Sequence, residues 1–118
     1  MRGVLTVLSN PRPGYEEAYN DWYQRIHLPD VLRVPGFIRA QRFRLAGGAA
    51  AAGFRYLAIY EFDSEQPEAL LGELQARAGG ADMVLSEAMD LEHYQTNTWV
   101  ALTAQPTLAE GARGREAA

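Results

Sequence analysis

One of the two histidines of this chain stands among residues that could transfer a proton. His27 follows Asn20 and Tyr23 at positions i, i+3 and i+7, so the three side chains share one face of a predicted helix. An imidazole takes or gives a proton near neutral pH, and a phenol can orient it or donate to a developing oxyanion. The pattern predicts acid–base chemistry, with His27 transferring the proton and Tyr23 and Asn20 assisting.

A structural role explains the same residues. Pro29 biases Leu28 away from the helical region, so the helix is expected to end at His27 or one residue later. The imidazole would then hydrogen-bond the last carbonyls of its own helix. Asp30 also has two interpretations. It could orient the imidazole and help to line a substrate site, or it could be the N-cap of a short turn that follows, which we favour.

The second histidine, His93, lies near the start of the predicted last strand. Because successive side chains of a strand point to opposite faces, His93 is expected on one face with Gln95, Asn97 and Trp99. This face could line a ligand cleft, with Trp99 contacting substrate, or it could lie at a dimer interface. A surface turn around His93 is an equal alternative. If His93 faced the same cleft as His27, the two imidazoles would form an acid–base pair.

Composition excludes several other functions. The chain has 118 residues, 47% of them hydrophobic, a net charge of −4 and no cysteine. This predicts one domain with a single core. The absence of a basic stripe argues against nucleic acid as a partner, and no run approaches the roughly 20 apolar residues of a membrane span. The two histidines lack metal-binding spacing, so no metal is expected. The first apolar stretch is too short for a signal peptide, so we expect a cytoplasmic protein.

Apolar alternation and turn residues predict the order of elements. Strands are expected over 4–9, 37–45, 54–62 and 94–104, and helices over 15–28 and 64–78, with Ser64 as N-cap of the second. A further short helical piece is expected over 81–91. This β-α-β-β-α-β order predicts an α+β, ferredoxin-like fold, with a four-stranded antiparallel sheet and both helices on one face. Residues 1–106 would form the domain and 107–118 a disordered tail.

The patterns also predict which side chains are buried. The first helix has an apolar stripe of Tyr15, Tyr19, Trp22 and Ile26, and the third strand has Phe54, Tyr56, Tyr60 and Phe62 on one face. Trp22, Tyr56, Tyr60 and Phe62 are expected mostly in the core, where one or two could wall a pocket for a planar substrate. Arg42 and Arg44 share a face of the second strand, which we interpret as solvated, with contact to an anionic ligand or a partner subunit as the alternative. Leu57 and Ile59 would be exposed on the bare face of the sheet. A second copy of the chain would cover them, which predicts a homodimer.

Several motifs carry a resemblance to a known family. They are Asn10-Pro11, Pro13-Gly14, Asn20, Trp22-Tyr23, His27-Leu28-Pro29-Asp30, Val34-Pro35-Gly36-Phe37 and Tyr56 to Phe62. Over residues 3–104 the chain resembles the dimeric α/β-barrel proteins and is most similar to their EthD-like branch. The resemblance implies action on aromatic or polyketide-like molecules in a cleft between helices and sheet, often without a cofactor. It also implies that the histidine at the end of the first helix is involved in acid–base chemistry, and His27 matches that position.

The sequence thus predicts a cofactor-independent lyase, dehydratase-cyclase or isomerase that acts on an aromatic or polyketide-like carbonyl compound. One alternative is a cofactor-free quinol-type monooxygenase, in which the substrate itself activates oxygen. The other is a non-enzymatic protein that binds a small ligand.

Overall fold

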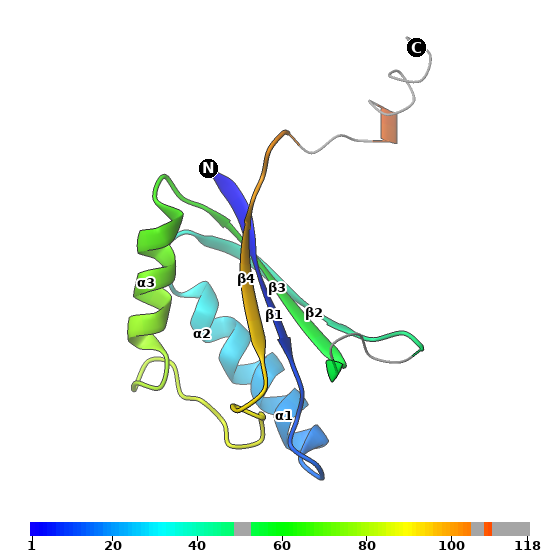
Figure 1. Cartoon of the computed structure of the whole chain (residues 1–118). Helices are drawn as coiled ribbons and strands as arrows, with labels where there is room; N and C mark the ends of the chain where they lie inside the picture. Colours follow the sequence, from blue (N-terminus) through cyan, green and yellow to red (C-terminus); the bar gives the residue numbers. More distant parts are fainter. Residues whose placement is uncertain (49–52, 105–107, 110–118) are drawn as a thin grey trace.

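A four-stranded antiparallel sheet organises the computed structural model, which describes residues 1–48, 53–104 and 108–109 (Figure 1). Its strands are β1 (Arg2–Ser9), β2 (Phe37–Arg44), β3 (Tyr56–Asp63) and β4 (Gln95–Val100). The spatial order is β2-β3-β1-β4, and each neighbouring pair is antiparallel. This is the strand order of the split βαβ pattern, so the predicted ferredoxin-like fold is confirmed.

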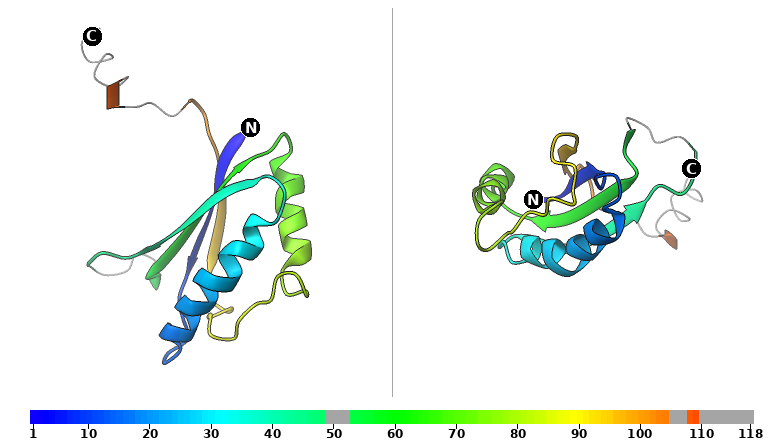
Figure 2. Two further views of the ribbon diagram at one scale, coloured as in Figure 1. Left: turned by 180° about the vertical axis from the view of Figure 1, so that it is seen from behind. Right: turned by 90° about the horizontal axis from the view of Figure 1, so that it is seen from below.

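The helices lie on one face of this sheet, which we call the inner face. The first helical region runs without a break through α1 (Glu16–Trp22), a π-helical segment η1 (Tyr23–His27) and α2 (Leu28–Leu32). Figure 2 shows this long helix lying across the sheet, with α3 (Pro67–Arg77) beside it. Glu16 and Glu17 occupy the first turn of α1, where the helix dipole favours negative charge.

The prediction that the first helix ends at His27 is wrong. The Leu28 N–H donates to the Tyr23 carbonyl, five residues back, and the helix continues to Leu32. A π turn shifts the hydrogen-bond register by one residue, so Pro29 falls in the first turn of α2, where its missing N–H is tolerated. Asp30 therefore lies inside a helix and is not the N-cap of a separate turn.

The π turn also changes which residues are buried. Tyr19 and Trp22 are buried as predicted, but Tyr15 is 48% and Ile26 45% exposed. Because a π turn takes more residues than an α turn, the α-helical period no longer applies beyond Tyr23. The buried side of the helix continues instead through Tyr23, Leu28 and Val31.

Two other predictions for the second half of the chain are wrong. Residues 81–91 form turns rather than a helix, since Asp90 donates to the Asn10 carbonyl and the Ala88 N–H to Ser86 Oγ. Side-chain bonds of this kind compete with helix formation. Ser64 likewise accepts a bond from the Gln66 N–H, 3.1 Å away, and α3 begins only at Pro67. The third strand begins later than predicted, because Phe54 lies outside it. The fourth strand is shorter than predicted at both ends, because Tyr94 and residues 101–104 lie outside it.

The alternation of β3 is confirmed. Tyr56, Ala58, Tyr60 and Phe62 are buried on the inner face, while Leu57 and Ile59 are half-buried on the opposite, outer face. The tail predicted for 107–118 lies, apart from residues 108 and 109, outside the described residues.

Gly3 provides a test of how closely β1 and β4 approach. A Cβ atom at this position would overlap the Trp99 carbonyl oxygen and the ring of Phe62. We expect Gly3→Ala to lower the free energy of unfolding by about 2 kcal/mol, because overpacking of this kind costs roughly 1–3 kcal/mol. The matched control is Gly72→Ala, since nothing lies within 4 Å of a Cβ there and alanine favours a helix by up to about 1 kcal/mol. Urea unfolding of both variants measures the difference, and equal stability would contradict the described contact between the two strands.

Candidate functional site

The imidazole of His27 is largely buried between aromatic rings. It stacks on the indole of Trp22, with ring centroids 4.6 Å apart and an interplanar angle of 22°, and it meets the ring of Tyr23 edge-on at 5.1 Å. Its Nδ1 atom is buried and has no hydrogen-bond partner among the described residues. The helix continues past it, and the side chain makes no capping bond. The interpretation of His27 as a C-cap is therefore wrong.

Burial controls the protonation of this imidazole. It lowers the pKa of His27 from 6.5 to about 4, and the nearby Asp30 carboxylate opposes the change. The desolvation effect exceeds the attraction of the carboxylate because Asp30, itself buried, is paired with Arg33 Nη1 at 2.5 Å. His27 is consequently neutral at pH 7 and can accept a proton or a hydrogen bond.

Two phenols remain protonated: that of Tyr23, which is next to the imidazole, and that of Tyr60, which is next to Tyr23. Burial raises the pKa of Tyr23 to about 12, and burial together with the neighbouring Tyr23 raises that of Tyr60 well above its ordinary value. The Tyr60 hydroxyl has no partner of hydrogen-bond geometry among the described residues. The region of His27 therefore holds a neutral acceptor and, from Tyr23 and its neighbour Tyr60, protonated phenols that can donate hydrogen bonds.

Arg42 lies in the same region, although its sequence pattern suggested a solvated face. A bulge between Phe37 and Arg39 shifts the register of β2, so Arg42 pairs with Ala58 on the inner face. The guanidinium lies 4.4 Å from the ring centroid of Tyr23, and within 5.4 Å of those of Tyr19 and Tyr56. We call Arg42 and these three rings the arginine–tyrosine cluster. Arg42 lies on the inner face because of the bulge, and the residue types of β2 do not predict that bulge.

Asn20 belongs to this cluster rather than to the surroundings of His27. Its Oδ1 accepts a bond from Arg42 Nη2 at 2.8 Å, and its Nδ2 donates to the Tyr56 hydroxyl at 3.4 Å. The Tyr56 hydroxyl donates in turn to Glu16. Among the described residues Asn20 thus bonds to Arg42 and Tyr56 rather than to His27, and its assistance to His27 stays a prediction. At the far side of the cluster, the Tyr19 hydroxyl and Ser9 Oγ lie 2.6 Å apart.

The remaining candidate residues lie elsewhere. His93 is exposed in the turn before β4 and stacks on Phe54 with a centroid distance of 4.3 Å. Trp99 is 57% exposed on the outer face, where its Nε1 donates to Thr6 Oγ1. Phe62 is a core residue packed edge-on against Phe37. The structure brings together His27, Tyr23, Trp22 and Tyr60, but the two imidazoles are not in contact, so it shows no acid–base pair between them.

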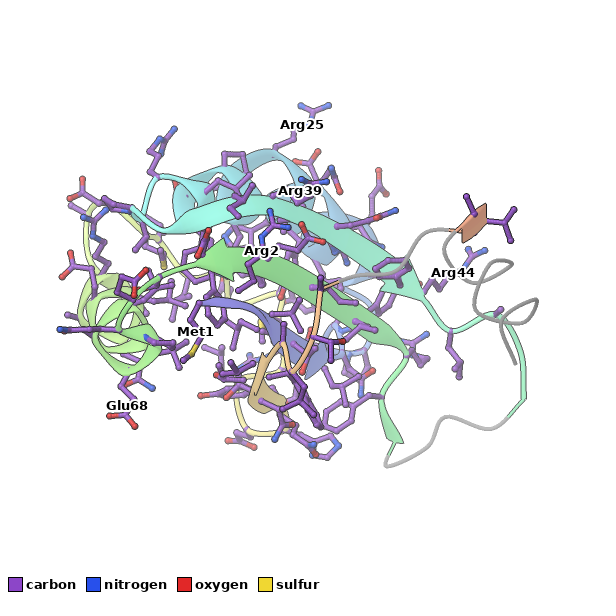
Figure 3. The ribbon with its side chains drawn as sticks, turned by 90° about the horizontal axis from the view of Figure 1, so that it is seen from above. Met1, Arg2, Arg25, Arg39, Arg44 and Glu68 are labelled. Carbon is purple, nitrogen blue, oxygen red and sulfur yellow. The ribbon has the colours of Figure 1, made fainter. Side chains whose placement is uncertain are left out.

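The four hollows found at residues 2–104 of the described chain are lined by residues other than His27. One of about 260 Å³ adjoins the cluster and is lined by Glu16, Tyr56, Arg55 and Arg44, among others. A larger one of about 880 Å³ lies at the outer face, between Arg2 and Arg39; Figure 3 labels both of these arginines. Trp22 is covered by the segment after α3, since its Nε1 donates to the Val84 carbonyl at 3.0 Å. A ligand that reaches His27 would have to displace this segment or enter past the cluster.

A family model matches more than half of the chain. The fold is an α+β, ferredoxin-like one, and the model of a family described as a domain of unknown function (DUF4286) matches residues 4–77. The chain belongs to this family, which is of the EthD-like type, so the resemblance seen in the sequence motifs is confirmed. A search of curated proteins found no match.

A solved structure is also similar. It is that of an ethyl tert-butyl ether D (EthD) family protein from Bacillus halodurans, with 14% identity and a TM-score of 0.46. The match covers 81% of this chain and 95% of that one. Among the described residues, no helix is long and apolar enough to cross a membrane, and no three His, Cys, Asp or Glu side chains are grouped to hold a metal.

The lowered pKa of His27 predicts a specific pH dependence of stability. Between pH 6.5 and about 4 the unfolded chain binds a proton at this residue and the folded chain does not. The free energy of unfolding should therefore fall as the pH decreases through this window, by up to roughly 3 kcal/mol. His27→Gln should remove this part of the slope, and His93→Gln should keep it. Urea unfolding at a series of pH values measures both, and an unchanged slope in His27→Gln would show that the imidazole is not buried in its neutral form.

Proposed function

We propose that the protein is a cofactor-independent enzyme that moves a proton on an aromatic or polyketide-like carbonyl compound, with His27 as the base. The observation that carries this proposal is the unpartnered, buried Nδ1 of a neutral imidazole. A buried polar atom without a partner costs about 1–3 kcal/mol, and such atoms in native structures call for an explanation. A substrate that brings a proton to Nδ1 supplies one.

The surrounding groups suit enolisation. In the proposed step the bond between the α-carbon and its hydrogen breaks, and the proton passes to Nδ1 of His27. The electron pair moves onto the carbonyl oxygen, which accepts a hydrogen bond from the Tyr60 or Tyr23 hydroxyl. The negative charge that develops beside the imidazole stabilises its protonated form, which offsets the lowering of its pKa by burial. Return of the proton to another atom gives an isomer, and loss of a β-hydroxyl group gives dehydration.

The helix geometry is consistent with this role. His27 is the last residue of the π-helical segment, and π turns are frequent at functional sites. The stack on Trp22 holds the imidazole in one orientation. Trp22 is therefore proposed as a positioning residue, and Tyr56, Phe62 and Asp30 as structural supports of the site.

Exchange of α-hydrogen for deuterium tests the proposal directly. Aromatic ketones and 1,3-diketones would be incubated in D₂O with the protein, and the loss of the α-proton signal followed by NMR. We expect His27→Gln to slow exchange on the order of a hundredfold or more, as for the loss of a general base. His93→Gln should exchange at the wild-type rate. Equal rates in wild type and His27→Gln would contradict the assignment of the base.

The same proteins distinguish the alternatives. Oxygen consumption after addition of a reduced quinol, without α-proton exchange, would favour a cofactor-free monooxygenase. Saturable binding of the probe compounds with neither reaction would favour a non-enzymatic ligand-binding protein. A cytoplasmic location remains part of the proposal.

We further propose that the protein is a homodimer that pairs through the outer face of the sheet. Apolar side chains gather there although no helix within residues 1–48 and 53–104 covers it: Phe43 is 42% and Trp99 57% exposed, and Leu57 and Ile59 lie between them. A sheet face of this kind requires a second layer to remove it from water. Two copies packed face to face would provide it.

A charge on this face should prevent association. We expect Ile59→Glu to be monomeric in sedimentation equilibrium at micromolar concentration, because pairing would bury an unpaired carboxylate. Ile26→Glu is the matched control, since Ile26 is 45% exposed on the helical side, and it should remain dimeric. A monomeric wild type would refute the proposed dimer.

A further inference from the structure

We propose that the substrate of the site carries a carboxylate and that Arg42 recognises it. This inference rests on the proposed function, because it names the substrate class of the same site. The argument begins with the hydrogen-bonding partners of Arg42.

Arg42 has no carboxylate partner among the described residues. Its Nη2 donates to the amide oxygen of Asn20, and its guanidinium also lies beside the Tyr19 hydroxyl, whereas a guanidinium has five N–H donors. Other arginines of the described chain do form ion pairs: Arg25 with Asp21, Arg33 with Asp30, Arg39 with Glu61 and Arg77 with Glu73. Arg42 is therefore a cation with donors to spare on the covered face of the sheet.

The tyrosine rings stabilise this cation through their faces, and among them only the Tyr19 hydroxyl is placed to accept one of those donors. A ring face attracts a cation through its quadrupole, but the N–H groups in the guanidinium plane still require acceptors. Glu16, the acidic residue bonded to the cluster, accepts the bond from Tyr56 and faces Arg55 at 3.9 Å. Arg42 is half-buried, so its charge is partly desolvated and a carboxylate would bind it more strongly than in water.

Tyr23 connects this cation to the proposed base. Arg42 Cζ lies 4.4 Å and the His27 ring centroid 5.1 Å from the centroid of the Tyr23 ring. The charge of Arg42 also acts on the inner phenols, since it lowers the pKa of Tyr60 against the larger effect of burial. A short keto acid could place its carboxylate at Arg42 and its carbonyl near the tyrosine hydroxyls. The α-hydrogen would then lie towards His27.

A purely structural role is the competing explanation. Through Asn20, Arg42 joins β2 to α1, so its removal could weaken the fold without affecting any ligand. The two roles differ in one measurable property. Only recognition of a carboxylate makes the loss of affinity depend on the charge of the ligand.

Phenylpyruvate and its methyl ester form a suitable pair of probes, because they share an aromatic ring, a ketone and an exchangeable methylene group. Binding of each is followed by NMR titration of the full-length protein. We expect wild type to bind the acid at least about tenfold more tightly than the ester, as a charge-assisted bond predicts. Arg42→Gln should bind both equally, with the affinity for the ester unchanged, and Arg42→Lys should keep part of the preference.

His27→Gln separates this inference from the proposed function. It should keep the preference for the acid but lose deuterium exchange at the methylene group. If wild type prefers the acid through Arg42 but does not catalyse exchange, carboxylate recognition stands and the proposed enzyme function fails. If Arg42→Gln keeps the preference, if wild type binds both probes equally, or if the acid shows no saturable binding up to about 10 mM, the assignment of Arg42 is wrong. Should Arg42→Gln fail to fold by circular dichroism, the same comparison is made with Arg42→Lys, where an undiminished preference for the acid overturns the proposal.

Discussion

The long first helix depends on a single irregular turn, and the candidate site depends on the helix. In the segment from Tyr23 to His27 the helix takes one additional residue, which lets it pass Pro29 and continue to Leu32. The same residue rotates the buried side, so that Tyr23 faces the sheet and Ile26 faces solvent. In a regular α-helix the proline ring would clash with the carbonyl four residues before it. The π turn removes that conflict and also places His27 against Trp22 and Tyr23.

A second irregularity lies in the sheet, opposite the first helix, and it completes the site. The bulge at the start of β2 keeps Phe37 on the inner face and then reverses the alternation of the residues that follow. Arg42 is thereby turned inward and Phe43 outward. The cation needs the faces of Tyr19, Tyr23 and Tyr56 to remain partly buried. The arginine–tyrosine cluster is therefore built by one local irregularity in each of two elements that are separate in sequence.

These two features mark the limit of what the sequence could predict. The order of elements and the alternation of β3 follow from local patterns, because period-two burial and glycine–proline breaks are properties of short segments. The pairing of His27 with Tyr23 also follows from helical spacing, since Tyr23 and His27 come four residues apart. The π turn and the bulge do not follow, because each arises where two elements pack and each changes the period on which the prediction relies. The assignments of Ile26 to the core and Arg42 to solvent both failed for that reason.

The same packing explains why the protonation states suit chemistry on a weakly acidic C–H bond. Burial between the helix and the sheet keeps the imidazole of His27 neutral and the phenols of Tyr23 and Tyr60 protonated, because it disfavours the charged form of each. A fixed cation in such an interface makes an anion the favoured occupant, because the charge of Arg42 is not cancelled by a neighbouring carboxylate. Substrate binding would then bring the charge that the site lacks. It would also satisfy the polar atoms that the protein leaves unpartnered at Nδ1 of His27 and at the Tyr60 hydroxyl. Stability and the proposed function thus make opposite demands on the same few atoms, and buried polar atoms without a partner are the expected result of meeting both.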